Sequence, residues 1–354
     1  MRLSVICIVA VLAGTLLLAG CSVQLDPAQE EIPISFSAGS QLLRDDATKG
    51  ATPKTPDDKV DFWVFGTKTV SKTTTPVFWG SDVTYSAGSW SYNPLRFWDP
   101  SASEYDFLGI SGPGIAPTNY ETSPILKATV TYNIAPPNND NYDLMGACRT
   151  VPRESMGTTV AMSFEHFLSA VSVVVYNDSP HQHVSLISYC FRNLYYTSAA
   201  EISYNISGHP SLLWKDKVKD TTNPLLGWTP NGTDGRELGP STHAPVESSE
   251  GLYWDMMIPQ TLNPLSLAPL LVVKYSLVDY SDDPEPVRTV SAAIETPIRL
   301  NTIKNSHGEE ILEWVEGKKY IYEIHIRYGG GISVTVITTD WDEVKAGTPG
   351  LIIS

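Results

Sequence analysis

The residue whose side chain most clearly offers a reactive group is Cys21, which directly follows an apolar stretch at the start of the chain. After Arg2, residues 5–19 carry no charged side chain, and the sequence Leu-Ala-Gly-Cys follows at 18–21. A basic start, a short apolar run and small residues before a cleavage site are typical of a secretory signal peptide. The small residues let a peptidase hold the backbone extended, and the thiol of Cys21 can form a thioether.

The tetrapeptide 18–21 resembles the lipobox of bacterial lipoproteins, in which the cysteine becomes the lipid-bearing first residue. The resemblance implies that residues 1–20 are a cleaved signal peptide and that Cys21 is acylated, with palmitate among its lipids, at the cell outer membrane. The apolar run is shorter than the roughly 20 residues of a membrane-spanning helix. We therefore expect a surface-exposed chain held by its lipid. The alternatives are a plain signal peptide, with Cys21 unmodified, or an uncleaved anchor helix.

Composition and charge exclude some partners and favour one fold class. The formal net charge is −15, whereas a nucleic-acid partner requires clustered Lys and Arg to neutralise phosphates, so we expect none. Only 18% of the residues are charged, while Gly (25), Pro (26), Tyr (17) and Trp (9) are plentiful. This mixture predicts an all-β protein with many turns, and 354 residues are enough for two domains.

The sequence contains no motif that indicates catalysis or a cofactor. Gly-x-Ser-x-Gly, Cys-x-x-Cys, phosphate-loop and zinc-helix patterns are all missing. His181 and His183 alternate as on a strand, but a metal site needs three or four ligands and no matching cluster is evident. We predict two surface histidines after the turn at 177–180, and no catalytic residue, metal or cofactor.

Two cysteines remain once Cys7 is removed with the signal peptide and Cys21 is acylated. They are Cys148 and Cys190. The oxidising cell envelope permits a disulfide between them, but a single pair in so long a chain is no disulfide framework. We therefore predict two buried free thiols, and a disulfide between Cys148 and Cys190 is the alternative.

The first stretch that predicts regular structure follows a polar tether at residues 21–31. Apolar side chains then alternate with Pro33, Ser35 and Ser37, which predicts a strand with one buried face, formed by Ile32, Ile34, Phe36 and Ala38. Residues 39–59 are dominated by Gly, Ser, Asp, Thr, Lys and Pro. They predict an exposed loop.

Further short runs of apolar, aromatic and β-branched residues predict a succession of strands. Residues 160–176 read as two strands with a break near 165–166, and glycines 329–331 predict a hairpin turn. We expect residues 205–250 to be a polar excursion and residues 309–315 to form a helical turn. The other predicted strands are 61–66, 104–110, 125–132, 184–190, 271–278, 320–327 and 332–337.

Several short motifs occur in an order that resembles the fimbrillin family, over nearly the whole chain behind the signal peptide. They are Ile34–Ala38, Val64–Gly66, Trp90–Tyr92, Arg96–Trp98, Asp143–Ala147, Phe164–Val171, Glu313–Gly317, Tyr320–Tyr322, Ile332–Val334 and Asp340–Trp341. The resemblance implies two tandem transthyretin-like β-sandwich domains, residues 32–157 and 158–354. It also implies a structural subunit of adhesive cell-surface fimbriae or pili, whose partners are other fimbrial subunits and a host or bacterial receptor.

In that family a trypsin-like protease cuts the loop behind the first strand, and a neighbour's terminal strand fills the groove that the lost strand leaves. Transferred to this chain, the displaced strand is Ile32–Ala38. Leu42-Leu43-Arg44-Asp45 resembles an Arg-specific site, so the resemblance places the cut at Arg44. An ordinary loop charge at Arg44, with the strand remaining in place, is the alternative.

The candidate donor segment is the tail, residues 344–354, with an apolar cluster at Leu351, Ile352 and Ile353. A donated strand would supply backbone pairing and alternate side chains to an open sheet edge. The alternative is that these residues complete the chain's own sheet.

A second class of function comes from the aromatic residues. A surface lipoprotein that binds glycans would stack sugars on exposed rings, and Trp79, Trp214 and Trp228 lie near predicted turns. A cluster of them on one surface would favour a glycan-binding protein, or an adhesin at an anchor or tip that does not polymerise. A groove beneath residues 32–38 would favour polymerisation.

Overall fold

The computed structural model describes residues 31–38, 61–112, 116–134, 143–219, 226–228, 235–245, 247–248, 251–252, 254–263, 267–281 and 287–340. Their regular structure is almost entirely β-strand, which confirms the all-β prediction. The helical elements in these ranges are single 3-10 turns: η2 (Arg153–Ser155), η3 (Leu300–Thr302) and η4 (Tyr328–Gly330). No helix within the described ranges has the length and apolar character needed to cross a membrane.

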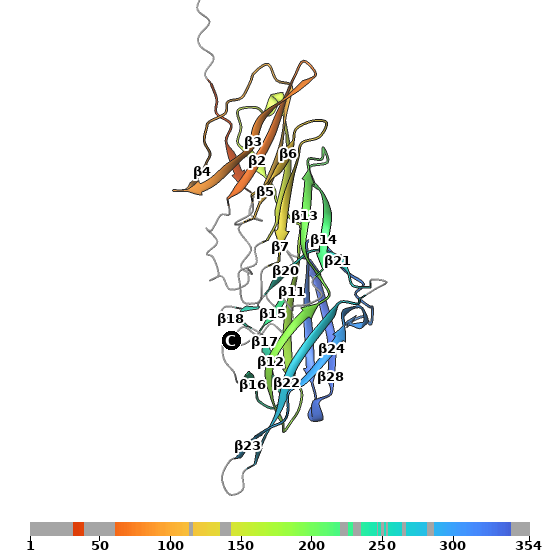
Figure 1. The fold of residues 1–354 in the computed structure, drawn as a ribbon. Helices are drawn as coiled ribbons and strands as arrows, with labels where there is room; N and C mark the ends of the chain where they lie inside the picture. The colour runs from red at the N-terminus through yellow and green to blue at the C-terminus, as the bar shows by residue number, and fades with distance from the viewer. Residues whose placement is uncertain are drawn as a thin grey trace, which may run out of the picture.

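The N-terminal strands occupy one end of an elongated molecule (Figure 1). One sheet has the order β10-β8-β5-β2-β3-β4, and β1 (Phe36–Ala38) pairs in parallel with β9 (Val160–Met162) beside it. Buried aromatic side chains fill the core between them, including Phe62, Phe78 and Phe107. The strands of the larger sheet are β2 (Phe62–Val70), β3 (Thr73–Ser86), β4 (Ser89–Ser91), β5 (Glu104–Ser111), β8 (Met145–Pro152) and β10 (Glu165–His166).

The C-terminal strands form two sheets around a common core. One has the order β17-β11-β27-β28-β25, with β20 also on β11, and contains β11 (Ser169–Asn177), β17 (Thr242–Pro245), β20 (Asp255–Met257), β25 (Lys304–Asn305), β27 (Lys318–Ile326) and β28 (Ile332–Asp340). The other has the order β15-β12-β22-β23, with β16 on β12 and β24 on β22. Its strands are β12 (His183–Arg192), β15 (Leu226–Trp228), β16 (Arg236–Leu238), β22 (Leu270–Ser281), β23 (Val287–Val290) and β24 (Ile294–Arg299).

Trp314 is the largest fully buried side chain of this core. Its indole N–H donates to the Tyr322 hydroxyl over 2.9 Å, and its ring lies edge-on to Phe191 at 5.8 Å. Trp314 belongs to β26 (Glu313–Trp314), which pairs with β21 (Gln260–Thr261). A further short pair joins β18 (Glu247–Ser248) to β19 (Gly251–Leu252).

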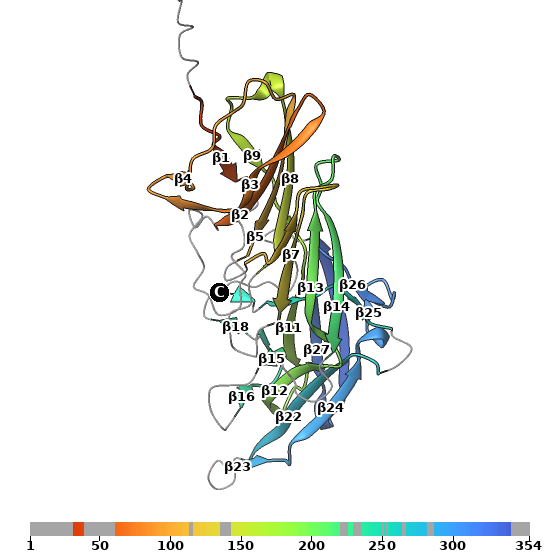
Figure 2. The ribbon, with the colours of Figure 1, turned by 45° about the horizontal axis from the view of Figure 1, so that its top comes forward.

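A sheet of the order β14-β13-β7-β6 joins the two ends of the molecule (Figure 2). It combines β6 (Asn119–Glu121) and β7 (Lys127–Asn133) with β13 (Tyr195–Ser203) and β14 (Ser211–Lys219). β9 and β10 lie after residue 157 in the chain, yet β9 pairs with β1 and β10 pairs with β8, and both of these partners lie before it. The sheets therefore cross the expected boundary between 157 and 158, and the division into two domains stays a prediction.

Most predicted strands are confirmed, and two predictions are wrong. Residues 205–250 are not one polar excursion, because β14, β15, β16, β17 and β18 lie within them. The expected helical turn at 309–315 ends instead in strand β26, whose backbone pairs with β21. In both places pairing with a neighbouring strand decides the structure, and local composition does not report it.

The hairpin from β27 to β28 is confirmed. Gly329 and Gly330 have φ values of 75° and 86°, which only glycine adopts without strain. One face of β27, formed by Tyr320, Tyr322, Ile324 and Ile326, is buried, and Lys319 on the other face is also only 8% exposed. Its ammonium lies 5.4 Å from the centre of the Trp254 ring, where the aromatic face stabilises the positive charge.

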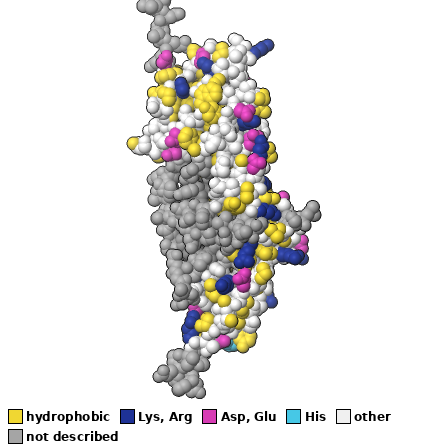
Figure 3. Space-filling view, viewed as in Figure 1, with side chains coloured by type: hydrophobic (Ala, Val, Ile, Leu, Met, Phe, Trp, Pro, Cys, Tyr) yellow, Lys and Arg dark blue, Asp and Glu magenta, His cyan; other side chains and the backbone are white. Residues whose placement is uncertain are grey.

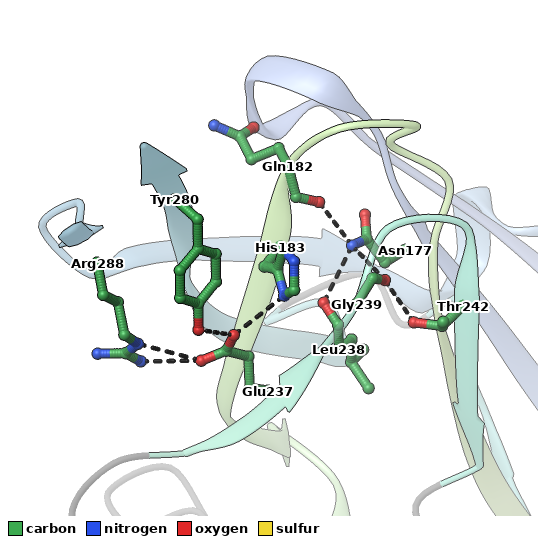
Figure 4. A network of polar contacts seen from close by, with 9 residues as sticks. All are labelled: Asn177, Gln182, His183, Glu237, Leu238, Gly239, Thr242, Tyr280 and Arg288. Carbon is green, nitrogen blue, oxygen red and sulfur yellow. Dashed lines mark hydrogen bonds and ion pairs between the residues drawn. The ribbon is translucent and has the colours of Figure 1, made fainter. Parts of the chain in front are cut away.

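A polar network fastens the strand ends at the far pole of the C-terminal half (Figure 4). The side-chain amide of Asn177 is 1% exposed and donates to the carbonyls of Gln182 (2.8 Å), Leu238 (3.2 Å) and Gly239 (2.8 Å). One buried amide thus joins the turn at 177–182 to the segment 238–239, about 60 residues later in the chain. Beside it, Glu237 accepts hydrogen bonds from Tyr280 and Arg288.

We expect Asn177→Ala to lower the free energy of unfolding by about 2–3 kcal/mol, because buried carbonyls lose their donor. Urea unfolding of the unlipidated chain measures the loss. Asn205→Ala is the matched control, since Asn205 closes a local turn to Ser207 (3.0 Å), and we expect a smaller change. Equal losses in the two variants would contradict the role of Asn177.

Candidate functional site

The structure describes one of the predicted site elements, the first strand. Cys21, Arg44 and the tail residues Leu351, Ile352 and Ile353 lie outside the described residues, so lipidation, cleavage and strand donation stay predictions. The site is therefore built from β1 and the surface that β1 covers.

The backbone around β1 is held between two different edges. On one side β1 pairs in parallel with β9, from Phe36 opposite Val160 to Ala38 opposite Met162, and the Val160 N–H donates to the Ser35 carbonyl over 2.8 Å. On the other side lies the segment 96–98. The Ile34 N–H donates to the Arg96 carbonyl (2.8 Å), and the Trp98 N–H donates to the Ile32 carbonyl (3.0 Å).

The side chains of this segment have one buried face, but it is shorter than predicted. Ile34 and Phe36 are 1% and 5% exposed, which confirms the alternation, and Ala38 is half-buried. Ile32 is 49% exposed, so its predicted burial is wrong. Ile32 precedes the residues that pair with β9.

Phe36 enters a cage of four aromatic rings, which we call the Phe36 cage: Phe62, Phe78, Tyr92 and Phe107. The ring centroids lie 6.1, 5.5, 5.7 and 5.5 Å from that of Phe36. All four contacts are edge-to-face, the arrangement that the quadrupoles of aromatic rings prefer. Phe36 is therefore the main apolar anchor of β1.

Tyr92 contacts both the side chain and the backbone of the first strand. Besides its place in the cage, its hydroxyl donates to the Ile34 carbonyl over 2.6 Å and accepts from the Arg96 N–H over 3.3 Å. Burial raises the pKa of the hydroxyl, which keeps it protonated as a donor. The sequence motif Trp90–Tyr92 contained this residue, but nothing in its spacing indicated that it reaches β1.

The forces that hold β1 are few, and the strands beneath it are independent of it. Burial of Ile34 and Phe36 contributes about 1.5–3 kcal/mol each, and each backbone hydrogen bond a net 0.5–1.5 kcal/mol, in order of magnitude. β2, β5 and β8 pair with one another without β1. Loss of β1 would thus expose the cage and two unpaired backbone edges while the main sheet keeps its hydrogen bonds.

Of the tryptophans singled out from the sequence, the two whose side chains the structure describes contact different rings. Trp79 is 47% exposed, with its ring 5.4 Å from that of Tyr120, whereas Trp214 is half-buried against Tyr132 at 6.4 Å. The side chain of Trp228 lies outside the described residues. Figure 3 shows hydrophobic side chains gathered over the N-terminal end of one face.

The predicted histidine pair and the two cysteines form no metal-binding cluster among the described residues. His183 Nδ1 lies 3.0 Å from Glu237 Oε1, and His181 is exposed. Within the described ranges no group of three His, Cys, Asp or Glu side chains could hold a metal ion. Cys148 and Cys190 are both free thiols, as expected, but only Cys148 is buried and Cys190 is half-buried. Burial raises the pKa of Cys148 to about 12.

We expect Phe36→Ala to remove most of the free energy that holds β1, because a buried Phe→Ala change costs about 3–5 kcal/mol unless the strand detaches first. Urea unfolding and hydrogen exchange of the β9 amides measure it. Ile32→Ala is the matched control at the exposed end of the same segment, with an expected change below about 0.5 kcal/mol. Similar effects of the two changes would contradict the anchoring role of Phe36.

Comparison with known proteins gives the same family that the motif order indicated. The solved structure of a fimbrial protein from Bacteroides vulgatus has a TM-score of 0.52 at 17% identity, covering 87% of this chain and 99% of that chain, and shows a shared fold. No protein with a curated description matches the chain.

Two other solved structures from Porphyromonas gingivalis have lower TM-scores. A fimbrilin has 0.41 at 12% identity (88% and 98% covered), and a tip fimbrial protein with a C-terminal truncation has 0.35 at 11% identity (80% and 95% covered). The sequence model described as "Fimbrillin-like" matches residues 48–341. Because that match spans most of the chain, the protein belongs to the fimbrillin-like family.

Proposed function

We propose that this protein is a non-catalytic structural subunit of an adhesive cell-surface fimbrium, and that its first strand is exchanged for a strand of a neighbouring subunit after proteolysis. One observation carries the proposal: β1 is a short element held by a single aromatic anchor and two backbone edges, above a sheet that pairs without it. Membership of the fimbrillin-like family supports the fimbrial role.

The exposed surface left by β1 would need a replacement strand. Without β1, the N–H groups of Val160 and Trp98 lose their acceptors, the Arg96 carbonyl loses the Ile34 N–H, and the Phe36 cage opens to water. Unpaired strand edges with an apolar trench associate readily with other extended chains. A donated segment would satisfy the backbone and the cage together, as in other cases of strand addition.

Arg44 lies between β1 and β2 in the sequence, so a cut there leaves β1 attached by non-covalent contacts alone. Cys21 lies on the same side of that cut as β1. If Cys21 carries the lipid, cleavage therefore releases the folded body from the membrane anchor and frees its groove in one step. Export, lipidation, cleavage and assembly would follow in that order.

A second candidate function is a lipid-anchored surface adhesin that binds glycans, or an anchor or tip subunit, and does not polymerise. It is favoured by the exposed Trp79 beside Tyr120, which is 43% exposed. Sugar-binding surfaces use such rings, but the contacts around Trp214 are with a different ring, Tyr132. Polymerisation is the better supported of the two, since loss of β1 would leave the Phe36 cage open to a replacement strand.

We expect limited trypsin digestion of the unlipidated chain to give one early cut at Arg44 or Lys49, followed by multimers that resist SDS without boiling. Mass spectrometry of the fragments and an unboiled gel measure both. Arg44→Gln should slow the cut, whereas Arg192→Gln, at an exposed arginine inside β12, should not. A nicked monomer that retains residues 32–38 and never multimerises would instead favour the adhesin.

We expect Cys21→Ala to abolish palmitate labelling and to leave the protein outside the outer-membrane fraction, because the alanine has no thiol to acylate. Cys190→Ala is the control, since Cys190 is half-buried in the folded body and should leave labelling unchanged. Normal labelling of the Cys21→Ala protein would refute lipidation at this residue.

A further inference from the structure

The Phe36 cage restricts which side chains a replacement strand could insert in place of Phe36. We propose that the groove beneath β1 selects an extended segment with an aliphatic residue followed, two positions later, by an aromatic residue. This inference rests on the proposed strand exchange and specifies its partner. An aromatic side chain in that segment would take the place of Phe36, and aliphatic segments would bind poorly.

The cage is matched to a ring because every wall is itself the edge or face of a ring. The four centroids surround that of Phe36 at 5.5–6.1 Å, with interplanar angles of 67–87°. A branched aliphatic side chain is smaller than a phenyl ring and has no edge to present to these faces. It would lose the edge-to-face contacts and leave unfilled space.

The rings that form the cage pack against other buried groups on the side away from Phe36, so the cage is not free to collapse around a smaller side chain. Phe62, Phe78 and Phe107 are all 0% exposed. A Cβ atom on Gly66 would lie 3.0 Å from Phe107 Cδ1 and 3.1 Å from Phe78 Cδ2, so these rings already pack against bare backbone. Phe62 is braced by Phe164, whose ring centroid lies 5.2 Å away.

Tyr92 fixes the register of the bound segment relative to the cage. Its hydroxyl holds the Ile34 carbonyl over 2.6 Å while its ring forms one wall around Phe36. The bound carbonyl therefore belongs to the residue two positions before the aromatic one. The residue between them, Ser35, points outward and is exposed, with its hydroxyl 3.1 Å from that of Thr159, so that position tolerates other small polar residues.

The candidate donor tail of this chain lacks the required pattern. Residues 344–354 contain no aromatic residue, and Leu351, Ile352 and Ile353 are successive aliphatic residues. Presented by a second copy, this tail would place an aliphatic side chain in the cage. We therefore expect it to bind more weakly than a segment that carries phenylalanine at the anchoring position.

The test uses the unlipidated chain nicked by trypsin between β1 and β2, and labelled peptides whose incorporation is followed by fluorescence anisotropy. The probes are the peptide of residues 31–38, its Phe36→Leu and Phe36→Ala forms, a Ser35→Thr control, and the peptide of residues 344–354. We expect the native and control peptides to bind alike. The Phe36→Leu form and the tail peptide should bind at least about 10-fold more weakly, and the Phe36→Ala form more weakly still.

Equal affinity of the native and Phe36→Leu peptides, or tighter binding of the tail peptide, would overturn the aromatic selection while leaving strand exchange intact. If the native peptide is not incorporated at all, strand exchange itself fails. A second measurement then still tests the cage: Phe36→Leu in the uncut chain should lower the Tm, and an unchanged Tm would show that the cage accepts an aliphatic side chain equally well.

Discussion

The attachment of the first strand depends on one contact, the insertion of Phe36 into the cage formed by Phe62, Phe78, Tyr92 and Phe107. The backbone of β1 pairs over only three residues with β9, and such a short ladder holds little by itself. The aromatic anchor turns a short strand into a fixed part of the core. It also concentrates the attachment of β1 at one point.

The rest of the fold explains why loss of β1 need not unfold the protein. β2 sends Phe62 and Val64 to the N-terminal core and Phe65 to the larger core shared with the C-terminal sheets. The β14-β13-β7-β6 sheet ties both halves together, and Asn177 fastens the far pole. That sheet and the Asn177 network lie outside the surface beneath β1. The strands β2, β5 and β8 also pair with one another without β1.

The positions of many strands were predictable from the sequence, because a strand with one buried face shows alternating apolar residues. The alternation around Ile34 and Phe36 predicted a strand with one buried face, and motif order predicted the family. The contact from Tyr92 to β1 was not predictable, because it joins residues far apart in the chain with no shared local pattern. The burial of Lys319 under Trp254 and the strands within residues 205–250 were missed for the same reason: partners distant in sequence decide them.

The most direct test of the central claim is hydrogen exchange at the amide of Val160, which donates to the Ser35 carbonyl of the first strand. The account predicts slow exchange in the intact chain, fast exchange after nicking and removal of β1, and slow exchange again in the assembled multimer, where a neighbour's strand takes its place. Continued fast exchange of Val160 in the multimer would contradict the account, because subunits would then associate without filling the groove.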